Sequence, residues 1–329
     1  MSVHDTLERA FAPLAASVAA GRIPGGVLGI VEADGRRAVR AIGSAQLEPT
    51  LRPMHEGIWF DLASLTKVIF TTPRILRAAG TGALDLDAPL VSVIPDFRQY
   101  NVDNWERRIT FRQCLGHQTP FPGVFPLYTY GTDPNLLRAF LLQHEWPAGP
   151  AVYSDINFIL LGIALERLAN TTIRDMDPGP GFAWSAAPAN AAATERCAWR
   201  GRVVSGEVHD ENCFALQGSG HAGLFGTAAS VLDYAGTLLQ GGPVVDLMRT
   251  PLGPRRTHGW ERPYEGWSGG ERCTPDTIGH TGFTGTGLWL DFARGRAWTL
   301  LTNRVHPSRF SDSGILGLRR AVGDLVNTD

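Results

Sequence analysis

The chain has 329 residues, of which 43% are hydrophobic and 19% charged, and its formal net charge is −2. This length exceeds one typical domain and is sufficient to bury a substantial core. The arginines are scattered without a basic run, which argues against a nucleic-acid partner, and no apolar segment is long enough to span a bilayer.

The N-terminal part of the chain predicts a helix followed by a β-hairpin. Apolar residues recur at helical spacing from Leu7 to Val18, and two apolar runs at residues 27–31 and 38–42 flank an Asp-Gly turn. Residues 1–9 lack the charged and apolar regions of a signal peptide. We therefore expect a cytoplasmic protein, or a periplasmic or secreted one if a signal has been removed.

The middle of the chain is predicted to be mostly helical. The expected helices cover residues 64–79, 109–115, 133–143, 157–168 and 227–239. The segment 157–168 is apolar nearly all round and should be buried. Residues 174–208 are rich in Pro, Gly and Ala and lack periodicity, so we expect a long loop or lid over the site. The four cysteines follow no CxxC spacing and are expected to be reduced and mostly structural.

The C-terminal part returns to strands, at residues 285–290 and 297–302, before a final helix at 313–326. Strands thus lie at both ends of the chain and helices between them. We predict an α+β fold in which one antiparallel sheet is flanked by the first and last helices. Residues 1–62 and 246–329 would form this lobe, and residues 63–245 a mostly helical lobe that carries the lid.

A Ser-x-x-Lys motif occupies residues 64–67. Lys67 is the only lysine, and the other 29 basic residues are arginines. Burial or nearby positive charge can make an amine neutral but not a guanidinium, so the lone lysine indicates a position where deprotonation matters. Residues three apart on a helix have Cβ atoms about 5–6 Å apart, which would place Ser64 beside Lys67. The Ser64 N–H, near the helix N-terminus, would be free to bind an oxyanion.

Two later motifs can supply partners for this serine. Tyr153-Ser154-Asp155 precedes the buried helix, and a tyrosine beside a cation can pass protons between nucleophile and leaving group. His280-Thr281-Gly282-Phe283 opens a glycine-rich run where a substrate backbone can lie along a strand edge. The Phe283 N–H is the candidate for a second oxyanion donor. A core tyrosine and an ordinary glycine-rich strand entry remain the structural alternatives.

In combination, these motifs resemble the serine β-lactamase and penicillin-binding protein superfamily, and most of all its class C β-lactamase-related hydrolases. That group includes esterases, D-aminopeptidases and DD-carboxypeptidases. Ser64-x-x-Lys67, Tyr153-x-Asp155 and His280-Thr281-Gly282 follow in the family's order, and the resemblance covers roughly residues 25–305. Further similar segments are residues 60–63, 115–119, 160–162 and 301–304. Residues 206–212 and 220–225 are similar to a branch with periplasmic DD-carboxypeptidase-like proteins.

The resemblance implies a β-lactamase/transpeptidase-like fold with its active site between the two lobes. It implies an acyl-enzyme and no metal or cofactor, with the catalytic residues Ser64, Lys67 and Tyr153. The backbone N–H groups of Ser64 and Phe283 would form the oxyanion hole. The substrate-binding residues would be Asp155, His280, Thr281 and Gly282. Candidates for contacts under the lid or behind the site are His117, His209, Asn212 and His221.

The chain departs from the family pattern at two positions. Asp155 stands where the family has asparagine, and His280 stands where it has lysine. A histidine with an ordinary pKa of about 6.5 is mostly neutral at pH 7. We therefore expect a preference for esters or amides without an obligatory carboxylate, weak β-lactam turnover, and tighter binding of carboxylates as the pH falls toward 6.

The sequence thus predicts a serine hydrolase, an esterase or a peptidase or amidase, acting on small ester, amide or peptide substrates through an acyl-enzyme on Ser64. A β-lactamase or DD-carboxypeptidase proper, and a non-catalytic binding or sensor module on the same fold, are the alternatives. Gly266-x-Ser268-x-Gly270 matches a nucleophile elbow, but no strand precedes it, so we predict a loop. The cluster His209, Asp210, Glu211 and His221 matches no helix-borne zinc spacing, and we predict a hydrogen-bonded loop there.

Overall fold

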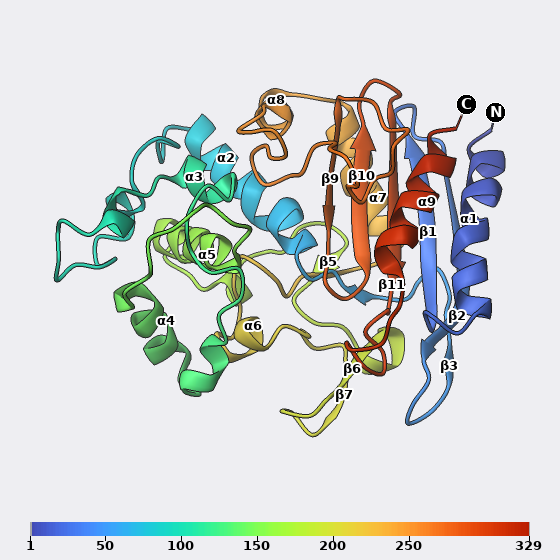
Figure 1. Ribbon diagram of the computed structural model, residues 1–329, viewed down its shortest axis with the longest axis horizontal. Coiled ribbons are helices and arrows are strands. Elements are labelled where there is room, and N and C mark those ends of the chain that lie inside the picture. The colour runs from blue at the N-terminus through green and yellow to red at the C-terminus, as the bar shows by residue number, and fades with distance from the viewer. Residues whose placement is uncertain (1, 329) are drawn as a thin grey trace.

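A six-stranded antiparallel sheet joins the two ends of the chain in the computed structural model, which describes residues 2–328 (Figure 1). The strand order is β3-β2-β1-β11-β10-β9. The bounds are β1 Gly25–Glu32, β2 Arg37–Gln46, β3 Arg52–Pro53, β9 Thr277–Thr281, β10 Thr286–Asp291 and β11 Arg296–Thr302. Strands β1 and β11, from opposite ends of the sequence, pair in the centre, with Ile30 opposite Trp298. The predicted α+β class, hairpin and C-terminal strands are confirmed.

Helices cover both faces of this sheet. Helix α1 (Val3–Ala19) and helix α9 (Ile315–Val326) pack together on one face, close to both termini (Figure 1). Helix α1 begins with a capping box between Ser2 and Asp5, and its apolar stripe faces the sheet. Helix α7 (Ala228–Leu239) packs against β1 and β11. We expected this helix in the mostly helical lobe, residues 63–245. Because its apolar residues pack against the sheet, the expected boundary at residue 245 does not separate the sheet and its helices from the helical lobe.

The remaining helices form the other side of the molecule. They are α2 Thr72–Gly80, α3 Phe111–Leu115, α4 Pro134–Gln143, α5 Asp155–Ala169, α6 Glu211–Ala215 and α8 Pro243–Arg249. Short 3₁₀ helices lie at Leu90–Ser92, Trp105–Arg108, Leu127–Tyr130, Ile173–Asp175 and Pro188–Asn190. The predicted helices are all present, and α5 is buried over ten consecutive residues, as its apolar sequence indicated. Across residues 2–328, none of the helices has the length and apolar character to cross a membrane.

Residues 174–208 are more ordered than the expected long loop. Strand β5 (Phe182–Ala183) joins β4 (Phe60–Asp61) and β8 (Phe225–Gly226) in a three-stranded sheet, ordered β4-β8-β5. Strands β6 (Ala193–Cys197) and β7 (Arg202–Ser205) form a hairpin. Strands of two to five residues are too short to give a readable period, which is why composition alone suggested a loop. Strand β4 ends at Asp61, three residues before the predicted nucleophile Ser64.

Candidate active site

The predicted nucleophile lies on a strained turn between β4 and the following helix. Ala63 has a φ of 47°, in the left-handed region that L-residues seldom adopt. The buried carboxylate of Asp61 holds this turn, because it accepts hydrogen bonds from Ala63 N–H (2.8 Å) and from His209 N–H (2.6 Å). Burial raises the pKa of Asp61, and these two hydrogen bonds oppose that effect. Asp61 stood in the sequence next to the motif, but nothing there marked it as the residue that fixes Ser64.

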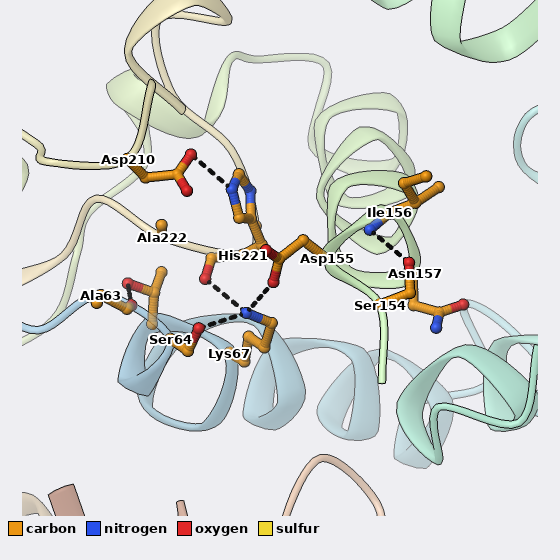
Figure 2. Close-up of polar contacts among 12 residues, drawn as sticks. Ala63, Ser64, Lys67, Ser154, Asp155, Ile156, Asn157, Asp210, His221 and Ala222 are labelled. Atoms are coloured by element: carbon orange, nitrogen blue, oxygen red, sulfur yellow. Dashed lines mark hydrogen bonds and ion pairs between the residues drawn. The ribbon is translucent and has the colours of Figure 1, made fainter. Parts of the chain in front are cut away.

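The helix after Ser64 begins with a π-helical segment, Lys67–Thr71, and continues as α2. The expected helix is therefore correct in extent, but it begins with a π-helical segment, which is wider than an α-helix. Such segments are frequent at functional sites. Lys67 is fully buried there. Figure 2 shows three contacts converging on Lys67 Nζ. The ammonium donates to Ser64 Oγ (2.7 Å) and to the carbonyl oxygen of His221 (3.1 Å), and it forms an ion pair with Asp155 Oδ1 (2.8 Å).

The charge state of Lys67 is set by the carboxylate beside it. Burial acts to lower the pKa of Lys67, but the charge of Asp155 and the phenol of Tyr153 outweigh it, so the pKa is raised above 10.5. A carboxylate at 2.8 Å is the physical reason, since an opposite charge this close stabilises the ammonium. The resting site therefore holds Lys67 as a cation.

Tyr153 lies in the same cluster, between two histidines. Its ring centroid is 4.3 Å from that of His117, 6.1 Å from that of His280 and 5.3 Å from Lys67 Nζ. Ser154 N–H donates to His117 Nδ1 (3.2 Å), which leaves the proton of neutral His117 on Nε2. His280 Nδ1 donates to the Thr281 carbonyl (3.0 Å), which leaves its Nε2 as an acceptor.

His280 does not have the ordinary pKa assumed from the sequence. Burial lowers its pKa well below 6.5, and the charges of Lys67 and Arg256 act in the same direction. Burial likewise lowers the pKa of His117. Both rings are therefore neutral throughout the physiological range, and the expected gain of charge on His280 near pH 6 is wrong.

Both predicted oxyanion donors are free. Within residues 2–328, neither Ser64 N–H nor Phe283 N–H donates a hydrogen bond to another group. Two threonines in the turn from β9 to β10 tie Phe283 to the nucleophile turn, because Thr284 Oγ1 donates to Asp61 O (2.8 Å) and Thr286 Oγ1 to Leu62 O (3.0 Å). Unpaired N–H groups on two segments held together in this way are suited to binding a developing negative charge.

Glycine at position 282 is required by this close approach. A Cβ there would lie 2.1 Å from Thr286 Oγ1 and 2.6 Å from the Leu62 carbonyl oxygen. Gly282 and Thr281 thus stand at the end of β9, where the sequence placed them as substrate-binding residues.

The four residues expected under the lid or behind the site have different surroundings. His117 contacts Tyr153, and His221 contacts Lys67 through its carbonyl. His209 Nε2 lies 2.9 Å from Glu195 Oε2, and its ring stacks on Phe283. Asn212 donates to Phe125 O (2.8 Å) and accepts from Tyr128 N–H (3.1 Å). Asn212 therefore holds α6 to a neighbouring loop, and within residues 2–328 its side chain forms no hydrogen bond with Ser64, Lys67 or Tyr153.

The two rival sites, a nucleophile elbow at Ser268 and a metal cluster around His209 and His221, lie in different surroundings. Ser268 is buried, and its Oγ accepts a hydrogen bond from Trp289 Nε1 (3.2 Å) beneath the sheet, so it is not an exposed nucleophile elbow. Ligand atoms of Asp155, Asp210 and His221 lie within 4.8 Å of one another, but His209 faces Glu195 instead. Figure 2 shows His221 Nε2 directed at Asp210, and the two atoms that form this hydrogen bond are 2.9 Å apart. This contact is of the kind expected for a hydrogen-bonded loop.

This geometry defines an acyl-transfer site. It combines a serine hydroxyl bonded to a lysine, a neighbouring phenol and two unpaired backbone N–H donors. These are the parts that a hydrolase needs to form and break a covalent acyl-enzyme.

The chain belongs to the beta-lactamase family, whose model matches residues 7–321. It is similar to the "N-acetylmuramyl-L-alanine amidase" of Bacillus subtilis strain 168, with 29% identity over 88% of this chain and 79% of the relative. It is also similar to the "Putative D-alanyl-D-alanine carboxypeptidase" of Escherichia coli K12, with 26% identity over 80% of this chain and 73% of the relative. The predicted family is confirmed, and the chain is a serine hydrolase of that family.

Solved structures support the fold. The structure described as "EstCE1, a hydrolase with promiscuous acyltransferase activity" superposes with a TM-score of 0.75. It shares 21% sequence identity, and the match covers 99% of each chain. The predicted β-lactamase/transpeptidase-like fold is confirmed by this likeness.

Proposed function

We propose that this protein hydrolyses carboxylic esters or amides through an acyl-enzyme on Ser64 and turns over β-lactams weakly. The observation that carries the proposal is the 2.7 Å contact between Ser64 Oγ and Lys67 Nζ, beside the unpaired N–H groups of Ser64 and Phe283. The names of an amidase and a carboxypeptidase among the relatives support amide as well as ester substrates.

The proposed reaction has two halves. Ser64 Oγ attacks the substrate carbonyl while its proton passes to the Lys67–Tyr153 pair, and the oxyanion is bound by the two backbone N–H groups. The pair then protonates the leaving alcohol or amine. In the second half, water attacks the acyl-enzyme carbonyl and gives a proton to the same pair. The bond to Ser64 Oγ then breaks, the pair returns the proton to Ser64 Oγ, and the acid is released.

Because Lys67 is charged in the resting site, it must lose a proton before it can act as a base in the formation of the acyl-enzyme. An ammonium cannot accept the serine proton until it has given one up, and Asp155 at 2.8 Å and Tyr153 are the groups beside it. Asp155 therefore takes part in setting the protonation of the pair, a role that an asparagine could not fill. Weak β-lactam turnover is proposed from the same two departures, Asp155 and a neutral His280 that offers no fixed charge.

A phosphonate that reacts with activated serines tests the proposal. Intact mass should increase by one adduct, and peptide mapping should locate it at Ser64. Ser64→Ala should abolish both labelling and hydrolysis of a short-chain p-nitrophenyl ester, whereas the matched control Ser268→Ala should still be labelled. An adduct at Ser268, or an unlabelled and inert protein that still binds cell-wall peptides, would contradict the proposal and favour a binding module.

A further inference from the structure

We propose that Arg319 is a positioning residue of the oxyanion hole, and that its buried positive charge strengthens the Phe283 N–H donor through the peptide that joins Gly282 to Phe283. The inference rests on the proposed acyl-transfer function and deepens it. It assigns a part in stabilising the oxyanion to a residue on helix α9, outside the three motifs.

Arg319 bonds to both ends of the turn between β9 and β10. Its Nη2 group donates to the Gly282 carbonyl oxygen at 2.8 Å and to the Thr286 carbonyl oxygen at 2.7 Å. The Gly282 carbonyl and the Phe283 N–H belong to one peptide unit, and a planar trans peptide directs these two groups to opposite sides. The guanidinium therefore binds the back of the peptide whose front is the second oxyanion donor.

The backbone of this turn does not need Arg319 to satisfy its carbonyl groups. The Gly282 carbonyl also accepts from Gly285 N–H (3.1 Å), and the Thr286 carbonyl accepts from Gly282 N–H (2.9 Å). Each carbonyl would keep a hydrogen bond if the arginine were removed. An arginine that only completed the turn would be a costly choice, because burying a cation without a paired anion is unfavourable.

No carboxylate neutralises Arg319 by direct contact. Only 7% of the residue is exposed, and in the part of the chain that the structure describes it forms no ion pair. Glu261 attracts it from a distance, but that carboxylate is bound by Arg256 at 3.0 Å. Burial lowers the pKa of Arg319, yet a guanidinium stays charged at neutral pH. An uncompensated positive charge thus lies behind the oxyanion hole.

This charge acts where negative charge develops during the reaction. A donor bound to a peptide carbonyl polarises the peptide, so its N–H becomes a stronger hydrogen-bond donor. In a buried site the guanidinium also attracts the oxyanion directly. Both effects are larger for the oxyanion than for the neutral carbonyl of the bound substrate, so Arg319 should act on kcat more than on KM. Neither effect requires a carboxylate on the substrate.

Two measurements test the inference: hydrolysis of a neutral p-nitrophenyl ester and inhibition by phenylboronic acid. Ser64 Oγ forms a bond to boron and passes its proton to the Lys67–Tyr153 pair, which leaves a tetrahedral boronate anion with one oxygen in the oxyanion hole. Arg319→Met should lower kcat and boronate affinity about 10- to 100-fold each, less than the roughly 10²–10³-fold cost of removing a whole donor. KM should change by less than about threefold.

Two further variants separate charge from hydrogen bonding. Arg319→Lys keeps the charge and should retain more kcat and boronate affinity than Arg319→Gln, which keeps a neutral donor. This comparison decides the same point if Arg319→Met does not fold. Arg320→Met is the matched control, because Arg320 is the next residue on α9, partly exposed and paired with Glu271 at 2.6 Å. Its kcat and boronate affinity should stay within about twofold of the wild-type values.

Several results would overturn the inference. They are an unchanged kcat and boronate affinity in Arg319→Met, a loss confined to KM, equal losses in Arg319→Lys and Arg319→Gln, or an equal loss in Arg320→Met. A wild type that hydrolyses no ester would instead contradict the proposed function. The boronate affinities, which require no turnover, would then still decide the role of Arg319.

Discussion

Replacing Asp155 with asparagine tests whether the negative charge of Asp155, rather than the size of its side chain, controls the protonation of Lys67. The asparagine side chain would keep nearly the same size and an acceptor oxygen but would remove the negative charge 2.8 Å from Lys67 Nζ. A close opposite charge moves a pKa by about 1–3 units, which corresponds to about 1.4–4 kcal/mol. Without it, burial becomes the dominant influence, and the pKa of Lys67 should fall.

The assay is the pH dependence of kcat/KM for a neutral p-nitrophenyl ester. Activity requires Lys67 to become able to accept a proton, so a raised pKa places the acid limb of the profile at high pH. Asp155→Asn should therefore move this limb to lower pH by about 1–3 units. A limb that stays in place would refute the idea that Asp155 controls the protonation of Lys67.

The same substitution has a stability readout. Removing one partner of a buried ion pair costs about 3–5 kcal/mol, and Asp155 is 29% exposed, so we expect the lower end of that range near pH 7. The loss should shrink as the pH rises through the lowered pKa of Lys67, because the buried amine then carries no charge. Denaturant unfolding at pH 7 and pH 9.5 measures this, with the wild type as reference, and an equal loss at both pH values would argue against the explanation.

Further substitutions address the other parts of the site. Lys67→Arg should lower kcat for the neutral ester by at least about 10²–10⁴-fold with an unchanged circular dichroism spectrum, and near wild-type turnover would place the base elsewhere. Tyr153→Phe should lower kcat by a similar factor with little change in KM, and a change confined to KM would make the phenol a binding group. Gly282→Ala should cost about 1–3 kcal/mol of stability and most of the activity, whereas Gly317→Ala, in open space on α9, should be neutral or stabilising; equal effects would refute the close-approach argument. The ratio of kcat/KM for a carboxylate-bearing ester to kcat/KM for a matched neutral ester should stay flat from pH 8.5 to pH 6, because burial keeps His280 neutral; a rise toward pH 6 would show that His280 gains charge and binds the carboxylate.

Much of the fold follows from local patterns in the sequence. The helical spacing of apolar residues predicted α1, α4, α5, α7 and α9, and the helices expected at 109–115 and 133–143 begin with side-chain caps from Thr110 and Asp133. The contact between Ser64 and Lys67 also follows from local geometry, since a spacing of three brings two side chains together on one turn of a helix. These features are decided by residues within a few positions of one another.

Features that depend on contacts between distant segments could not be predicted from local patterns in the sequence. The order of Ser64, Tyr153 and His280 predicted that they meet, but only by resemblance, and nothing local indicated Asp61 as the holder of the strained turn. Helix α7 packs on the sheet because β1 and β11 come together from opposite ends of the chain. Strand β5 exists only because the distant strand β8 lies beside it, whereas β6 and β7 pair with each other in a local hairpin.

The charges of the site were decided by the tertiary structure alone. A side chain's pKa depends on its burial and on the charges around it, and neither is visible in a motif. The motif indicated that deprotonation matters at Lys67, but only the structure shows that Asp155 holds it as a cation in the resting site. His280 was given an ordinary pKa and is kept neutral by burial.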